Sequence, residues 1–180
     1  MTLRKCATTL ILLSFIGTAW ASLAPGSKAP DFSAPASLGG QTFNFSLSAA
    51  LRQGPVVLYF YPAAFTAGCT VEAHEFADAI ERFKGLHATV IGVSHDPIET
   101  LNKFSVSECR SKFPVAADPD LAIAKSYDAT LWFWPGHANR TTYLIAPDGS
   151  IIFSYSAQSP DGHIRNTLQA LEQWSQRHSH

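Results

Sequence analysis

The chain has 180 residues, 46% of them hydrophobic, which suffices for one domain with an ordinary core. Its 13 Lys+Arg and 14 Asp+Glu nearly balance and form no visible basic patch. This composition argues against nucleic acid as a partner.

The first 21 residues predict a secretory signal peptide. Arg4-Lys5 form a basic start, residues 10–16 form a short apolar core, and Ala19-Trp20-Ala21 is a small-x-small cleavage site. An uncleaved N-terminal anchor is the alternative, although the apolar run is short for a membrane span. Cys6 precedes the apolar core and is poorly placed for lipid attachment. We expect cleavage after Ala21, one domain over residues 22–180, and export to the bacterial periplasm.

Residues 22–36 are rich in Ala, Pro and Ser and predict an extended leader. Further along, apolar runs rich in β-branched and aromatic residues indicate strands, and one-sided apolar periodicity indicates helices. The predicted strands cover residues 42–45, 56–61, 89–94, 114–118, 141–146 and 151–155. The predicted helical segments cover residues 46–52, 68–84, 97 towards 109, 119–127 and 161–175.

Several element ends carry their own signals. Asp96 is the expected N-cap of the third helical segment, with Pro97 in its first position. Gly85 suits the end of the second segment, and Pro147-Asp148-Gly149-Ser150 predicts a hairpin turn. The order of elements predicts an α/β fold with a mixed central sheet flanked by helices.

Cys69 is the most informative residue of the chain. It follows the predicted buried strand at 56–61 and lies in the first turn of the amphipathic helix at 68–84. The unpaired N–H groups and the dipole of a helix N-terminus favour thiolate over thiol. An inert, buried cysteine at a helix start is the alternative interpretation.

The pattern Pro62-x-x-x-Thr66-x-x-Cys69 resembles the active-site signature of the peroxiredoxins. The wider string, from Tyr59-Phe60-Tyr61 through Gly68 to Glu72, is most similar to the bacterioferritin-comigratory, or peroxiredoxin Q, branch of the AhpC/TSA type. The resemblance extends over about residues 26–176. It implies a thioredoxin-like fold and a thiol-specific peroxidase that uses no metal, haem or flavin.

The same resemblance assigns the site residues. Cys69 is the expected peroxidatic nucleophile, Thr66 would hydrogen-bond the peroxide, and Pro62 would shield the sulfur and fix the loop. Arg140, directly before the strand at 141–146, would stabilise the thiolate and the charge on the departing oxygen. Glu72 would orient Arg140. The alternatives are a helix-capping Thr66, a surface Arg140 and a solvated Glu72.

Resolution of the oxidised thiol is where the chain departs from the commonest form of this branch. That form has a second cysteine five residues after the first, where this chain has His74. A related subset uses a cysteine in the next helix, which implies that Cys109 resolves Cys69 as an intramolecular disulfide after local unwinding. The alternatives are a permanent Cys69–Cys109 staple and an unrelated buried thiol in a one-cysteine peroxidase.

Two other groups of residues attract attention. His74 and His95 belong to no spaced ligand set, so we expect ordinary histidines and no metal site. The run Trp132-Phe133-Trp134 would line the substrate approach, form a contact surface or pack in the core.

The expected activity is reduction of hydrogen peroxide and alkyl hydroperoxides, with recycling by a thioredoxin-like dithiol protein. We expect a monomer, because an intramolecular resolving pair needs no partner chain; a dimer formed through the aromatic run is the alternative. After signal cleavage we expect no membrane association. An exported thiol–disulfide exchange protein is the first rival, but such proteins carry Cys-x-x-Cys and this chain has none. A non-catalytic binding module is the second rival, and the set Pro62, Thr66, Cys69 and Arg140 argues against it.

Overall fold

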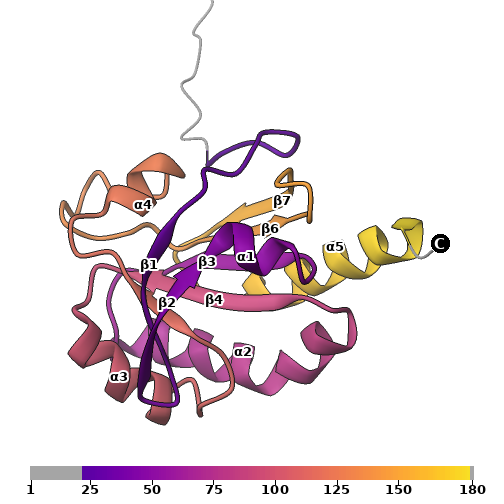
Figure 1. Cartoon of the computed structure of the whole chain (residues 1–180). Coiled ribbons are helices and arrows are strands. Elements are labelled where there is room, and N and C mark those ends of the chain that lie inside the picture. The colour runs from indigo at the N-terminus through magenta and orange to yellow at the C-terminus, as the bar shows by residue number, and fades with distance from the viewer. Residues whose placement is uncertain (1–21, 179–180) are drawn as a thin grey trace, which may run out of the picture.

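The computed structural model describes residues 22–178; the predicted signal peptide lies outside them. A seven-stranded sheet has the order β2-β1-β5-β4-β3-β6-β7 (Figure 1). Its strands are β1 (Ser33–Leu38), β2 (Gln41–Ser46), β3 (Val56–Phe60), β4 (Thr89–Ser94), β5 (Val115–Ala117), β6 (Thr141–Ile145) and β7 (Ile151–Ser156). The helices are α1 (Leu47–Leu51), α2 (Ala67–Gly85), α3 (Ile98–Ser107), α4 (Ala122–Ser126) and α5 (His163–His178).

The sheet is mixed, as the order of elements predicts. Strand β4 pairs in parallel with β3 and β5, whereas β3 pairs antiparallel with β6 and β6 with β7. All five residues of β3 are buried, because the strand is central and helices cover both of its faces.

Alternate side chains of β3 enter two different apolar clusters. Val57 and Tyr59 face α2, α3 and α5, while Val56, Leu58 and Phe60 face α1 and α4. Figure 1 shows the same arrangement, with α2 and α3 below the sheet and α1 and α4 above it. The apolar face predicted for α2 is confirmed, since it is buried in full at Ala73, Phe76, Ala77, Ile80 and Phe83.

Three predicted boundaries are wrong. Part of the expected leader forms β1, because Ser33–Leu38 pairs with both β2 and β5. The N-cap of α3 is Pro97 and not Asp96, whose carboxylate instead accepts hydrogen bonds from Ala64 N–H and the Ser94 hydroxyl. Helix α4 begins at Ala122, three residues after the predicted start.

Within residues 22–178 no helix is both long and apolar enough to cross a bilayer.

Candidate active site

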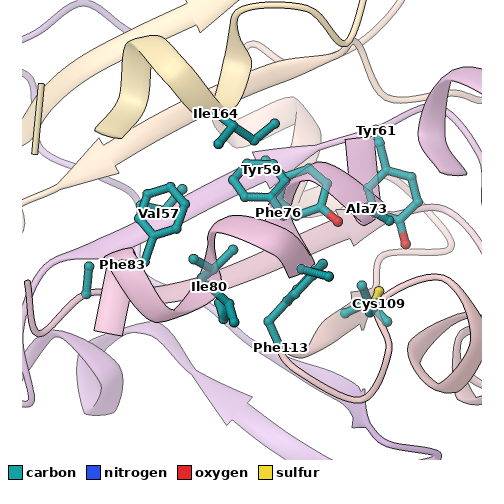
Figure 2. Close-up of a cluster of buried hydrophobic side chains, with 14 of the residues drawn as sticks. Val57, Tyr59, Tyr61, Ala73, Phe76, Ile80, Phe83, Cys109, Phe113 and Ile164 are labelled. Atoms are coloured by element: carbon teal, nitrogen blue, oxygen red, sulfur yellow. The ribbon is translucent and has the colours of Figure 1, made fainter. Parts of the chain in front are cut away.

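Strand β3 and helix α2 together place Cys69. The strand ends at Phe60, a six-residue loop follows, and α2 begins at Ala67 with Thr66 in the N-cap position. Cys69 is therefore in the first turn of α2, as predicted, where backbone N–H groups point towards the open end of the helix. The thiol is buried and belongs to the cluster between the sheet and α2, part of which Figure 2 shows.

Arg140 lies directly against this thiol. Its Nη2 is 3.3 Å from Cys69 Sγ, its Nη1 donates to Glu72 Oε2, and its Nε donates to the carbonyl of Gln158 at 3.0 Å. A Cβ on Gly68 would lie 3.1 Å from Arg140 Nη2, so the absence of a side chain leaves room for the guanidinium. All of the Arg140 nitrogens are thus fixed, and one of them faces the sulfur.

Glu72 is fully buried, so its interpretation as a solvated helix position is wrong. Burial raises the pKa of the Glu72 carboxyl to about 8, although the adjacent Arg140 opposes this shift. For Arg140, burial works against the charge, but Glu72 and Cys69 outweigh it and raise the guanidinium pKa. The alternative of a surface arginine is also wrong, since Arg140 is 4% exposed.

The loop before Cys69 is tied to the end of β4. Pro62 is buried, and its carbonyl accepts a hydrogen bond from His95 Nδ1 at 2.9 Å. Asp96 Oδ2 accepts from Ala64 N–H at 2.7 Å. Phe65 has a left-handed backbone with φ of 64°, a strained conformation for a bulky residue, and its ring contacts Phe104 of α3. These contacts fix the loop on one side of the thiol.

Thr66 is exposed in the N-cap position, but its hydroxyl does not cap the helix. Thr66 Oγ1 donates instead to the carbonyl of Ala63 at 3.0 Å. The helix-capping interpretation is therefore wrong for the Thr66 side chain. Because the hydroxyl acts as a donor to Ala63, its oxygen keeps both lone pairs as acceptors.

Cys109 follows the end of α3 and is also a buried, free thiol. It lies beside Phe113 at one end of the same apolar cluster that contains Cys69 (Figure 2). Burial raises the pKa of the Cys109 thiol. The two following residues, Arg110 and Ser111, both have left-handed backbones, with φ of 51° and 56°. Cys69 and Cys109 are both free thiols in this structure.

The structure also places the remaining candidates. His74 pairs with Glu108 at 2.9 Å and is an ordinary helix histidine, as predicted. Among residues 22–178 no cluster of His, Cys, Asp and Glu fits a metal ion. The run Trp132-Phe133-Trp134 is exposed, so core packing is wrong for it. Trp134 stacks on His137, whose ring contacts His95 beside the Pro62 carbonyl.

Sequence reasoning missed three participants. The Gln158 carbonyl could not be found, because every residue has the same backbone acceptor. Gly68 belongs to the motif, but its spatial role becomes visible only when Arg140 is placed. His163, the first residue of α5, is fully buried and approaches Glu72, and its only signal was a histidine near the start of a predicted helix.

A buried thiol in the first turn of a helix, facing a fixed guanidinium on a mixed thioredoxin-like sheet, defines a thiol-dependent oxidoreductase. The comparisons with known proteins identify which one. Residues 25–154 match the model of the AhpC/TSA family, and the chain belongs to this family of peroxiredoxins. Its members are thiol peroxidases, and this chain is an enzyme of that type.

Individual relatives agree with this assignment. The chain is 33% identical, over 149 residues, to a Mycobacterium tuberculosis protein described as a peroxiredoxin, covering 81% of this chain and 94% of the relative. The crystal structure of peroxidoxin BcpB from Mycobacterium tuberculosis superposes with a TM-score of 0.75 at 32% identity, covering 83% of this chain and 96% of that one. Peroxiredoxin Q of Xanthomonas campestris superposes with a TM-score of 0.68 at 27% identity, covering 78% and 90%. The similarity to the peroxiredoxin Q branch is thereby confirmed.

Proposed function

We propose that the protein reduces hydrogen peroxide and organic hydroperoxides at Cys69 and resolves the product with Cys109. The observation that carries this proposal is the 3.3 Å contact of Arg140 Nη2 with Cys69 Sγ in the first turn of α2. Both the helix end and the guanidinium stabilise a thiolate, which is the nucleophilic form of cysteine.

In the first step, the Cys69 thiolate attacks one peroxide oxygen. The S–O bond forms, the O–O bond breaks, and the departing hydroxide or alkoxide takes a proton to leave as water or alcohol. Cys69 is oxidised to a sulfenic acid. Arg140 Nη2 lies close enough to stabilise the negative charge as it moves from sulfur to the departing oxygen.

In the second step, Cys109 attacks the sulfur of the Cys69 sulfenic acid, a disulfide forms and water leaves. Cys109 is fully buried at rest, with a raised thiol pKa, so its segment must open before it reacts. A thioredoxin-like dithiol then reduces the bridge. We further propose a monomer that is exported to the periplasm after cleavage at Ala21.

The test is the intact mass of the fully reduced protein after one equivalent of hydrogen peroxide, quenched within seconds. Loss of two hydrogens, with a Cys69–Cys109 bridge in the peptide map, is the expected result. Matched samples carry Cys69→Ser, which should not react, and Cys109→Ser, which should stop at the sulfenic acid. An unchanged mass in the wild type would refute the peroxidase assignment.

The burial of Cys109 favours one second candidate, a one-cysteine peroxidase reduced by an outside thiol. In that case the wild type gains one oxygen on Cys69 and forms no bridge, even at long reaction times. The same experiment therefore separates the two mechanisms.

The proposed role of Thr66 has its own test. Because its hydroxyl oxygen retains free lone pairs, we expect it to accept a hydrogen bond from the peroxide. Thr66→Val should lower the rate of Cys69 oxidation roughly 100-fold, whereas Thr66→Ser should keep most of it. Full activity of Thr66→Val would refute this role.

A further inference from the structure

His163 is the first residue of α5, and its side chain is fully buried next to Glu72. Its Nδ1 is 2.7 Å from the Thr142 hydroxyl, and its Nε2 is 3.2 Å from the carbonyl of Ala157. The same Nδ1 is 3.7 Å from Glu72 Oε1. These contacts place one imidazole ring against β6, the end of β7 and α2.

The hydrogen bonds fix the protonation of the ring. A carbonyl only accepts, so Nε2 carries the proton that is donated to Ala157. Burial lowers the pKa of His163 to about 4, with a smaller contribution from Arg140, so the ring is neutral at pH 7. Nδ1 is then an acceptor and takes the proton of the Thr142 hydroxyl.

The two carboxyl oxygens of Glu72 have different surroundings, and one of them is positioned only by the His163 ring. Oε2 accepts from Arg140, whereas Oε1 is buried and has no hydrogen-bond partner. Nothing directional therefore holds Oε1, and its position follows from the group packed beside it. That group is the Nδ1 edge of His163, which Thr142 and Ala157 hold from both sides.

We propose that His163 is a positioning residue of the peroxidase site: it fixes the Glu72 carboxyl group, which in turn holds the Arg140 guanidinium against Cys69. The contacts form one continuous chain from Thr142 through His163, Glu72 and Arg140 to the sulfur. This inference rests on the proposed roles of Cys69 and Arg140. Loss of His163 frees Glu72 to rotate or to admit water, and Arg140 then no longer faces the thiolate in one geometry.

The test uses two conservative variants that separate the edges of the ring. In His163→Asn the amide occupies roughly the position of Nδ1, beside Glu72, while in His163→Gln it occupies roughly that of Nε2, beside Ala157. We expect His163→Gln to lower the second-order rate of Cys69 with hydrogen peroxide roughly tenfold. The pH profile for alkylation of Cys69 by iodoacetamide should also move to higher pH. His163→Asn should retain most of both properties.

Combination with Glu72→Gln distinguishes positioning from a general structural role. If His163 acts through Glu72, His163→Gln has little further effect in a Glu72→Gln background, so the two changes are strongly non-additive. Thr167→Val is the matched control: it removes another buried side-chain group one turn along α5 and should leave both readouts unchanged.

Normal behaviour of His163→Gln in both readouts would overturn the proposal, and so would either of two losses of rate. One is an equal loss from His163→Gln with and without Glu72→Gln, and the other is an equal loss from Thr167→Val. The alkylation profile needs no peroxide, so a protein that failed as a peroxidase would still report on His163. Conversely, normal peroxide reduction with an unmoved profile in His163→Gln would refute only the positioning role.

Discussion

Cys69 and Cys109 are both fully buried in one apolar cluster, yet their surroundings differ in nearly every other respect. Cys69 lies at the positive end of a 19-residue helix and contacts a guanidinium whose other nitrogens are also bound. Cys109 lies beyond the end of α3, where burial raises its thiol pKa without a cation to offset it among its described contacts. One thiol faces a fixed cation at a helix N-terminus, whereas burial raises the pKa of the other.

The backbones around the two cysteines differ as well. The loop before Cys69 has one left-handed residue, Phe65, and is held by hydrogen bonds from His95 and to Asp96. The segment around Cys109 combines two successive left-handed residues with side-chain contacts to α2, made by Glu108, Arg110 and Lys112. Strain favours opening of this segment and the contacts oppose it. We therefore expect Cys69 to be oxidised in the closed structure, whereas resolution requires the Cys109 segment to open.

The largest expected effect comes from removing one thiol at a time. Cys109→Ser should oxidise at Cys69 at a rate within about twofold of the wild type, because Cys109 has no part in the first step. Steady turnover with a thioredoxin-like reductant should nevertheless be lost. Single-turnover and steady-state peroxide consumption measure the two rates. A slowed first oxidation would show that the two environments are not independent.

Arg140→Lys tests the Cys69 side, where the guanidinium contacts the thiol. Lysine keeps the charge, but it cannot contact Gln158, Glu72 and Cys69 at the same time. We expect the rate of Cys69 oxidation to fall roughly 100-fold, while alkylation of unfolded Cys109 in denaturant stays unchanged. Stopped-flow measurement of the peroxide reaction tests this. A loss below about threefold would mean that charge alone suffices.

The Cys69 side could be predicted from the sequence much more completely than the Cys109 side. Cys69, its helix position and Arg140 follow from a local motif and from the strand pattern around it. The burial of Glu72 could not be predicted from the sequence. It depends on packing against α5, which begins more than 80 residues after Glu72. The left-handed residues after Cys109 are Arg and Ser, which carry no sequence signal for positive φ. A tertiary contact also explains why Asp96 is not the N-cap of α3. Its carboxylate accepts a hydrogen bond from Ala64 of the active-site loop and not from the helix.

The buried His163 gives the Cys69 side a pH dependence that the Cys109 side lacks. Its pKa is about 4 in the fold against 6.5 ordinarily, chiefly because of burial. Between these values the unfolded chain binds a proton that the folded chain does not, so stability falls as the pH drops from about 6.5 to about 4. The loss approaches about 3 kcal/mol and is complete below about pH 4.

Glu72 has the opposite effect and can be separated from His163. Its pKa in the fold is raised to about 8, so its contribution to stability falls as the pH rises. The charged or titratable groups that face the His163 ring are Glu72 of α2, Arg140 ahead of β6 and Tyr155 of β7. The difference in unfolding free energy between wild type and His163→Asn should shrink as the pH falls through this window. Urea denaturation at several pH values measures it, and a constant difference would contradict the prediction.

On the Cys109 side, Ser111→Gly should relieve strain in the closed segment. A non-glycine residue with φ of 56° costs about 1 kcal/mol, part of which is offset by the greater freedom of glycine after opening. We expect disulfide formation after oxidation to slow about threefold, with the first oxidation unchanged. His87→Gly is the control, because it relieves a similar φ of 57° away from Cys109. Faster disulfide formation in Ser111→Gly would contradict the role assigned to strain.

The smallest effect should come from Asp78→Asn, which removes the ion pair of α2 with Arg110, the residue after Cys109. Both side chains are largely exposed, so the pair contributes on the order of 0.5 kcal/mol. Its loss should make opening easier and speed disulfide formation about twofold, in the opposite direction to Ser111→Gly. Glu81→Gln, which removes the exposed pair with Lys84 on the same helix, should leave that rate unchanged. If both changes act alike, the surface charge of α2 and not the Arg110 contact sets the rate. If only Asp78→Asn accelerates the bridge, the closed segment is held by specific contacts to α2, and the slow movement belongs to Cys109 rather than to Cys69.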